Sequence, residues 1–282
     1  MKLVRYGERG AERPGLVAAD GTLHDLSGEV EDITSSVLAP ARLARLMALD
    51  TAMLPVVPGS PRFGVPLSGI GKIVAIGLNS IDHIEEMGYP RPKEPVIFIK
   101  ATSSLIGARD PIVRPKNSIK LDFEVELAVV IGSEAHYVSE AEALGHVAGY
   151  ALMNDVSERA FQREREGGTT KGKSADTFGP LGPWLVTADE VGDPQNLRLW
   201  TKLNGTSMQD STTARMLFGV ARLIAYITEF MSLQPGDVIS TGSPHGVGHG
   251  RKPPVFLQPG DVIEQGIEKL GTQRHVIVDW AG

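Results

Sequence analysis

Two glutamates, Glu124 and Glu126, lie in the otherwise apolar segment Asp122-Phe-Glu-Val-Glu-Leu-Ala-Val-Val-Ile131. The alternation of apolar and acidic residues predicts a strand in which both carboxylates lie on one face, about 7 Å apart. Their mutual repulsion and the cost of removing them from water are both offset if a cation binds between them. An edge strand with a solvated acidic face is the alternative that this segment leaves open.

A third carboxylate follows a second apolar run, Val147–Met153, which is also typical of a strand and is followed by Asn154-Asp155. Three carboxylates suit a hard cation, because Mg²⁺ prefers octahedral oxygen coordination and keeps positions for water and substrate. Mn²⁺ or Ca²⁺ fits the same ligands. The chain has no cysteine, which excludes thiolate metal sites, cysteine nucleophiles and disulfides. The candidate metal ligands are therefore Glu124, Glu126 and Asp155.

A candidate general base lies in Asn79-Ser-Ile-Asp-His-Ile-Glu-Glu86, directly after the apolar run Ile73–Leu78. On a helical turn His83 and Glu86 share a face. The carboxylate can then orient the imidazole and raise its basicity, as general base catalysis requires. A surface pair with no catalytic role is the alternative, since this spacing is common.

A loop rich in glycine and proline, Gly167–Pro183, carries Lys171 and Lys173. A lysine in such a loop can approach a ligand and stabilise a developing oxyanion, although a solvated flexible loop has the same composition. A second glycine-rich loop, Ser240–His249, lacks the lysine and the context of a phosphate-binding loop. We therefore do not interpret it as a nucleotide site.

The overall composition excludes several classes of partner. The 282 residues include 34 acidic and 28 basic side chains, a net charge of −6, with no long basic block, so nucleic acid is not an expected partner. No signal peptide begins the chain, and no segment approaches the roughly 18 apolar residues of a membrane span. We expect a cytoplasmic protein without a membrane partner.

The elements that position these residues are mostly strands. The 32 glycines and 19 prolines favour short strands joined by tight turns, so the predicted class is mainly β with some α. Residues 1–68 form a small N-terminal α+β domain, with an antiparallel meander around a type I′ turn at Asp20-Gly21 and a helix from Pro40. We predict a second, larger domain over residues 69–282, with an amphipathic helix over Leu217–Met231 and a short helix after the capping box Ser139…Glu142. Its predicted strands are Ile73–Leu78, Val96–Ile99, Phe123–Ile131, Val147–Met153, Trp184–Val186, Leu197–Leu203 and Val276–Val278.

Taken together, these motifs resemble the fumarylacetoacetate hydrolase family from about Lys72 to Val278. The resemblance is carried by the acidic strand, Asn154-Asp-Val-Ser-Glu-Arg159, Lys100-Ala-Thr-Ser-Ser104, Lys173-Ser-Ala-Asp-Thr-Phe-Gly-Pro180 and Pro235-Gly-Asp-Val-Ile-Ser-Thr-Gly-Ser-Pro244. The N-terminal segment is similar to the small domain that precedes the catalytic domain in longer bacterial members. The resemblance implies a β-roll-like catalytic domain of the fumarylacetoacetase C-terminal type, a homodimer, and Mg²⁺ bound by Glu124, Glu126 and Asp155.

The same resemblance implies roles for further residues. His83 and Glu86 match a His-x-x-Glu motif of members that cleave acylpyruvates, and form a dyad that activates water. Lys173 stabilises the oxyanion. The resemblance also implies that Arg159, Gln162 and Thr241 contact the substrate.

The implied reaction is Mg²⁺-dependent hydrolysis of a C–C bond in a 2,4-diketo acid with release of pyruvate. The longer members suggest a small-molecule 2-oxo acid substrate such as 2,4-diketo-3-deoxy-rhamnonate or -fuconate. Oxaloacetate decarboxylation and a ureidoglycolate lyase reaction are alternatives, because they need the same bound carboxylate but no water attacking a ketone. A third alternative is a non-enzymatic β protein that a metal stabilises.

Overall fold

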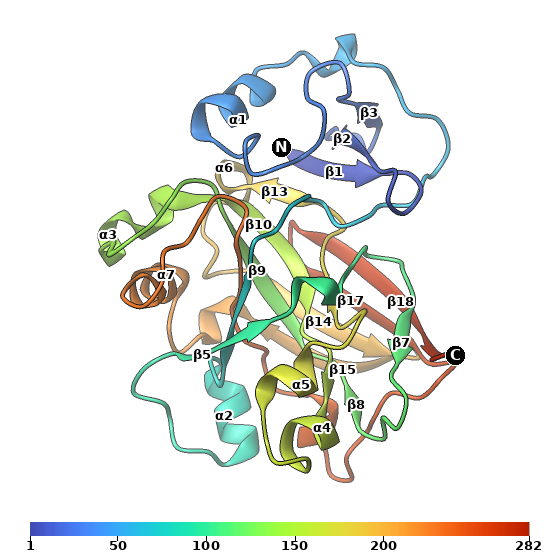
Figure 1. The fold of residues 1–282 in the computed structure, drawn as a ribbon, viewed down its shortest axis with the longest axis vertical. Coiled ribbons are helices and arrows are strands. Elements are labelled where there is room, and N and C mark those ends of the chain that lie inside the picture. Colours follow the sequence, from blue (N-terminus) through green and yellow to red (C-terminus); the bar gives the residue numbers. More distant parts are fainter. Residues whose placement is uncertain (282) are drawn as a thin grey trace.

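The structure, a computed structural model, describes residues 1–281 and is built around a nine-stranded sheet (Figure 1). In spatial order its strands are β3 (Leu23–Asp25), β2 (Arg13–Val17), β1 (Lys2–Tyr6), β13 (Leu185–Thr187), β10 (Val147–Asn154), β9 (Val125–Ile131), β16 (Val238–Ser240), β4 (Ile73–Gly77) and β5 (Val96–Lys100). Neighbouring strands are antiparallel except β16 and β4. The acidic segment leads into β9 inside the sheet, so the edge-strand alternative is wrong.

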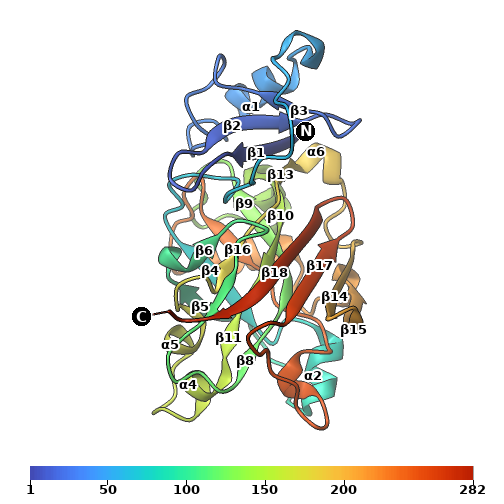
Figure 2. The same cartoon turned by 90° about the vertical axis from the view of Figure 1, so that its right-hand side faces the viewer.

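A second sheet has five strands: β15 (Thr206–Thr212), β14 (Arg198–Leu203), β17 (Val262–Ile267), β18 (Gly271–Asp279) and β7 (Ile112–Arg114). Figure 2 shows β17 and β18 crossing in front of β9 and β10. Two short pairs complete the strands: β8 (Leu121–Asp122) with β11 (Ser157–Glu158), and β6 (Leu105–Ile106) with β12 (Gly179–Pro180). The predicted mainly β class with some α is confirmed, and neither sheet closes into a barrel within residues 1–281.

The N-terminal meander is confirmed, but its predicted turn type is wrong. Ala18 and Thr22 pair across a three-residue loop in which Gly21 has a φ of 89°, whereas a type I′ turn also needs a positive φ at Asp20. Strand β1 pairs with β13, so the nine-stranded sheet continues through residues 1–68. The division of the chain at residue 68 stays a prediction.

The helices lie around these sheets and are short. Figure 1 shows α2, α4 and α5 together at one end of the molecule, and α3 and α7 on one side of the sheet. Their bounds are α1 (Pro40–Met47), α2 (Ile81–Met87), α3 (Glu140–Ala143), α4 (Arg159–Arg163), α5 (Thr169–Lys173), α6 (Ala188–Val191) and α7 (Val220–Thr228). The capping box of α3 is present as predicted, and α7 is shorter than the predicted helix over Leu217–Met231.

Strand β9 is buried on both faces. Its alternate residues Val125, Leu127, Val129 and Ile131 pack in one apolar cluster with the buried face of α7 (Leu223, Ile224 and Ile227). Ala128 and Val130 face a second cluster that includes N-terminal residues such as Leu3, Leu26 and Leu43. Glu126 alternates with the first set, so it shares the face of Ala128 and Val130.

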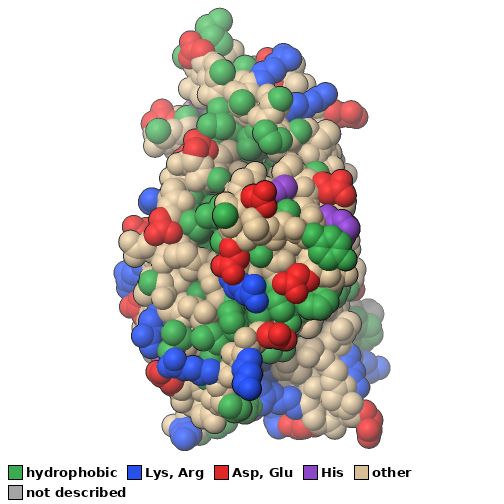
Figure 3. Space-filling model, turned by 90° about the vertical axis from the view of Figure 1, so that its left-hand side faces the viewer, with side chains coloured by type: hydrophobic (Ala, Val, Ile, Leu, Met, Phe, Trp, Pro, Cys, Tyr) green, Lys and Arg blue, Asp and Glu red, His purple; other side chains and the backbone are tan. Residues whose placement is uncertain are grey.

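The surface carries charges of both signs. Acidic and basic side chains are interspersed on the face drawn in Figure 3. No helix within residues 1–281 is both long enough and apolar enough to cross a bilayer.

Candidate active site

Three buried carboxylates meet where β9 begins and β10 ends. Glu124 directly precedes β9, Glu126 lies in it, and Asp155 follows β10. The antiparallel register pairs Val125 with Asn154, which brings these chain ends together. Glu124, Glu126 and Asp155 each offer one oxygen within 4.8 Å of the others, and they are 5%, 2% and 1% exposed. The predicted ligands are therefore clustered.

Three cations surround this acidic triad. The Arg159 guanidinium lies 2.6 Å from Glu124 through Nη2. The Lys173 ammonium contacts both Glu124 and Asp155. Lys100, fully buried at the end of β5, lies 2.5 Å from Asp155 Oδ1 and donates to the carbonyl oxygen of Lys173. Lys100 thereby links the triad to the backbone of α5.

The electrostatic environment shifts the pKa values of Glu124 and Glu126 in opposite directions. Burial alone would raise the pKa of Glu124, but the charges of Arg159 and Lys173 hold it well below its ordinary value. Glu126 is different, because burial and the negative charges of Asp155 and Glu124 raise its pKa to about 8. Its Oε2 accepts hydrogen bonds from Ser240 Oγ (2.6 Å) and from the backbone N–H of residue 242 (2.9 Å). Within residues 1–281 no cation forms an ion pair with it.

These donors fit a hard divalent cation. Glu126 forms no ion pair among residues 1–281, and the only cation that contacts the buried Asp155 Oδ1 there is the Lys100 ammonium. Three clustered carboxylates, one of which has no cationic partner and a raised pKa, are a set of oxygen ligands that Mg²⁺, Mn²⁺ and Ca²⁺ favour. Glu124, Glu126 and Asp155 would hold the ion.

The predicted dyad forms on helix α2. His83 Nδ1 lies 3.1 Å from Glu86 Oε2, and the backbone N–H of Gly246 donates to both oxygens of Glu86 at 3.0 and 3.1 Å. Burial opposes ionisation of Glu86, yet the hydrogen bonds from His83 and Gly246 lower its pKa. An ionised Glu86 holds the ring proton on Nδ1, which leaves Nε2 of His83 as a proton acceptor.

Asp82 fixes the helix that carries this dyad. Its carboxylate accepts hydrogen bonds from Ser211 Oγ at 2.6 Å and from Ser80 Oγ at 2.5 Å, and it lies 2.9 Å from His245 Nδ1. Although burial raises the pKa of Asp82, these partners lower it to about 2. Helix α2 is thus tied to β15 and to the loop after β16.

One cavity of about 300 Å³ brings most of the predicted residues together. Its lining includes His83, Glu124, Glu126, Arg159, Gln162 and Lys173. Asp155 and Glu86 lie behind this lining, in contact with Lys173 and His83. The Thr241 hydroxyl donates to the carbonyl oxygen of Leu127 at 2.9 Å, and Thr241 is not part of the lining, so its substrate contact stays a prediction.

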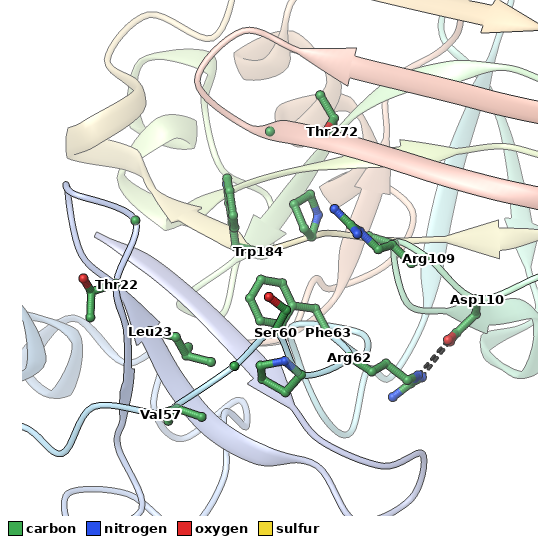
Figure 4. A pocket seen from close by; sticks show the side chains of 16 residues that line it. Thr22, Leu23, Val57, Ser60, Arg62, Phe63, Arg109, Asp110, Trp184 and Thr272 are labelled. Carbon is green, nitrogen blue, oxygen red and sulfur yellow. Dashed lines mark hydrogen bonds and ion pairs between the residues drawn. The ribbon is translucent and has the colours of Figure 1, made fainter.

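A second, larger cavity of about 780 Å³ lies elsewhere, between the N-terminal strands and the turn before β18 (Figure 4). Its lining includes Phe63, Arg109 and Trp184, and its Arg62 is paired with Asp110. None of the predicted site residues lines it. We assign the active site to the smaller cavity, because only that one combines a base, a buried cation pair and the acidic triad.

Residues 72–278 match the family model for the fumarylacetoacetate hydrolase C-terminal domain, over the same range as the motifs. The chain belongs to the fumarylacetoacetate hydrolase family. A 2,4-didehydro-3-deoxy-L-rhamnonate hydrolase of Sphingomonas sp. (strain SKA58) is 55% identical over 99% of this chain and 97% of the relative. The fumarylacetoacetate hydrolase of Exiguobacterium antarcticum is 36% identical, with a TM-score of 0.89 over 99% of this chain and 100% of that one. A maleylpyruvate hydrolase from Sphingobium sp. SYK-6 is 28% identical, with a TM-score of 0.82 over 99% and 100%.

Membership confirms that this chain is an enzyme of the hydrolase class, so the non-enzymatic alternative is wrong. Two residues of this site were given no specific role in the sequence-based prediction. Lys100 belongs to a quoted motif, and a lysine that ends an apolar strand was a signal that could have identified it. Ser243 lines the cavity, and it lies in the Pro235–Pro244 motif, which was the signal that could have identified it.

Proposed function

We propose that this family member is a metal-dependent hydrolase that cleaves the C–C bond of a 2,4-diketo acid and releases pyruvate. The observation that carries the proposal is that the His83–Glu86 dyad and the acidic triad serve one cavity. The substrate in the name of the Sphingomonas relative, 2,4-didehydro-3-deoxy-L-rhamnonate, is the first candidate, and the fuconate analogue is the second.

The floor of the cavity suits a 2-oxo acid. A bound Mg²⁺ would supply Lewis-acid polarisation of carbonyl and carboxylate oxygens. Arg159 and Gln162 line the cavity beside the triad, and their N–H groups are the donors that a substrate carboxylate needs. Arg159 is buried, which strengthens its interaction with a carboxylate because little water competes for it.

The chemical step needs a base and a stabilised oxyanion. His83 Nε2 takes a proton from water while the water oxygen bonds to the C4 carbonyl carbon. Lys173 stabilises the resulting C4 oxyanion electrostatically. When the C3–C4 bond breaks, its electron pair goes to C3, which is then protonated to give pyruvate, while C4 leaves as a carboxylic acid. Glu86 stabilises the imidazolium that forms during this sequence.

A panel of substrates tests this proposal directly. Purified enzyme is assayed for pyruvate release from 2,4-didehydro-3-deoxy-L-rhamnonate, its fuconate analogue, simple acylpyruvates, oxaloacetate and ureidoglycolate, each with Mg²⁺, with Mn²⁺ and with EDTA. We expect metal-dependent turnover of the diketo acids. Turnover of oxaloacetate or ureidoglycolate alone would overturn the proposal in favour of a decarboxylase or a lyase.

We further propose a homodimer that acts in the cytoplasm without nucleic-acid or membrane partners, as the resemblance and the composition suggest. Sedimentation equilibrium of the full chain tests the oligomeric state, and a concentration-independent monomer would refute it. Fractionation of cells that produce the protein tests the location.

A further inference from the structure

The active-site cavity has a buried floor and an exposed mouth. The floor residues Glu126, Arg159 and Lys173 are at most 5% exposed. In contrast, Tyr89 is 39% exposed, and Arg163 at the end of α4 is also exposed, although both line the same cavity. A substrate whose 2-oxo acid end binds at the floor therefore directs its tail toward Tyr89 and Arg163.

Arg163 is held at the mouth by two side chains from other segments. Its Nη1 lies 3.1 Å from Tyr89 Oη, after α2, and 3.1 Å from His249 Nε2, in the loop after β16. The His249 ring is stacked on Phe256 with centroids 6.4 Å apart. Because the Arg163 guanidinium can only donate, His249 Nε2 is the acceptor of this hydrogen bond. Burial and the charges of Arg163 and Arg159 lower the pKa of His249, which favours the neutral ring. The guanidinium is thus oriented before any ligand binds.

The orientation leaves donors unused. Only Nη1 of Arg163 makes hydrogen bonds to other side chains within residues 1–281, so Nε and Nη2 remain available to an oxygen atom in the cavity. The same cavity also has an apolar wall at Ile76, Val96 and Phe98. A tail with one oxygen and a small apolar end matches this combination of groups.

We propose that Arg163, oriented by Tyr89 and His249, is a specificity-determining residue that selects diketo acids carrying a hydroxyl on the carbon next to the cleaved carbonyl. The inference rests on the proposed function, since it assumes that the 2-oxo acid end lies at the floor. A hydrogen bond from a charged donor to that hydroxyl corresponds to a preference of about 10-fold to 100-fold. An analogue without the hydroxyl gains nothing from Arg163.

The test compares two substrates that differ only in the hydroxyl: 2,4-didehydro-3-deoxy-L-rhamnonate and 2,4-dioxohexanoate. In Arg163→Met we expect kcat/KM for the first to fall by about 10-fold to 100-fold and for the second to change by less than about 3-fold. For the hydroxylated substrate, kcat/KM of Arg163→Lys should lie between the values for wild type and Arg163→Met. The control is Arg165→Met, because Arg165 is an exposed arginine outside the cavity lining. This variant should leave the ratio of kcat/KM for the two substrates unchanged.

Two outcomes overturn the inference. Equal losses of kcat/KM for both substrates in Arg163→Met would show that Arg163 only supports the cavity. An unchanged kcat/KM for both substrates would show that the tail does not reach Arg163. If wild type cleaves neither acid, the proposed function fails separately, and calorimetric affinities of the two acids with Mg²⁺ replace kcat/KM. Equal affinity losses in Arg163→Met, or no measurable binding to wild type, would then overturn the selectivity.

Discussion

Replacing Glu126 by glutamine should stabilise the metal-free enzyme and weaken its response to Mg²⁺. Glu126 is fully buried without a cationic partner, and burial beside Asp155 and Glu124 raises its pKa from 4.5 to about 8. Glutamine keeps an oxygen to accept the hydrogen bonds from Ser240 and Gly242, but it carries no charge. The substitution therefore removes the ionisable group and leaves the local hydrogen bonding in place.

The sign and size follow from proton linkage. The pKa of Glu126 is higher in the folded protein than in the unfolded chain, so folding favours the protonated carboxyl. The stability that wild type gains from this protonated carboxyl is fully present below pH 4.5 and is lost as the pH rises toward 8. The slope approaches about 1.4 kcal/mol per pH unit, so wild type should lose about 2–3 kcal/mol between pH 5 and 7 relative to Glu126→Gln.

Mg²⁺ should offset most of the stability that wild type loses relative to Glu126→Gln. An ion that binds only the folded protein stabilises it by about 2.7 kcal/mol at 100 times Kd. Since the ion competes with the proton on Glu126, its effect on wild type should grow from pH 6 to 8, and Glu126→Gln should show a smaller gain.

Urea unfolding at pH 5, 6, 7 and 8, with EDTA or with Mg²⁺, measures these quantities. The exposed residue Glu8 supplies the matched control, Glu8→Gln, which should follow wild type throughout. The reasoning is refuted if Glu126→Gln and wild type show the same pH slope in EDTA and the same gain with Mg²⁺.

Three further predictions address the base, the buried lysine and the core. His83→Ala should lower hydrolytic turnover by about 10²-fold to 10⁴-fold while Mg²⁺ still raises the melting temperature; full turnover of every diketo acid would disprove the role of His83 as base. Lys173→Met leaves Glu124 and Asp155 without their shared ammonium, and urea unfolding in EDTA should show a loss of about 3–5 kcal/mol at pH 7; an unchanged midpoint would contradict the ion pairs. Leu223→Ala, on the buried face of α7, should lower the free energy of unfolding by about 2–5 kcal/mol and leave kcat per folded molecule unchanged; a selective loss of kcat would speak against a packing role.

Local patterns in the sequence identified the strands and helices that position the site. The acidic strand, the run before Asp155 and the capping box of α3 depend on neighbouring residues only, so alternation and spacing were enough to predict them. The turn at Asp20-Gly21 was predicted less well, because its type depends on which residues pair across it, and Ala18 pairs with Thr22.

The sequence by itself also determined the chemistry: the absence of cysteine, the three carboxylates, and the spacing of His83 and Glu86 limited the site to oxygen ligands and an imidazole base. The tertiary structure alone decided that Glu126 lacks a cationic partner, that Lys100 joins the triad, and that Arg163 is held at the mouth of the cavity. The physical reason is that a carboxylate's charge state and a guanidinium's direction depend on contacts across the sheets. Arg163 and His249 are 86 residues apart, and no local spacing encodes their contact.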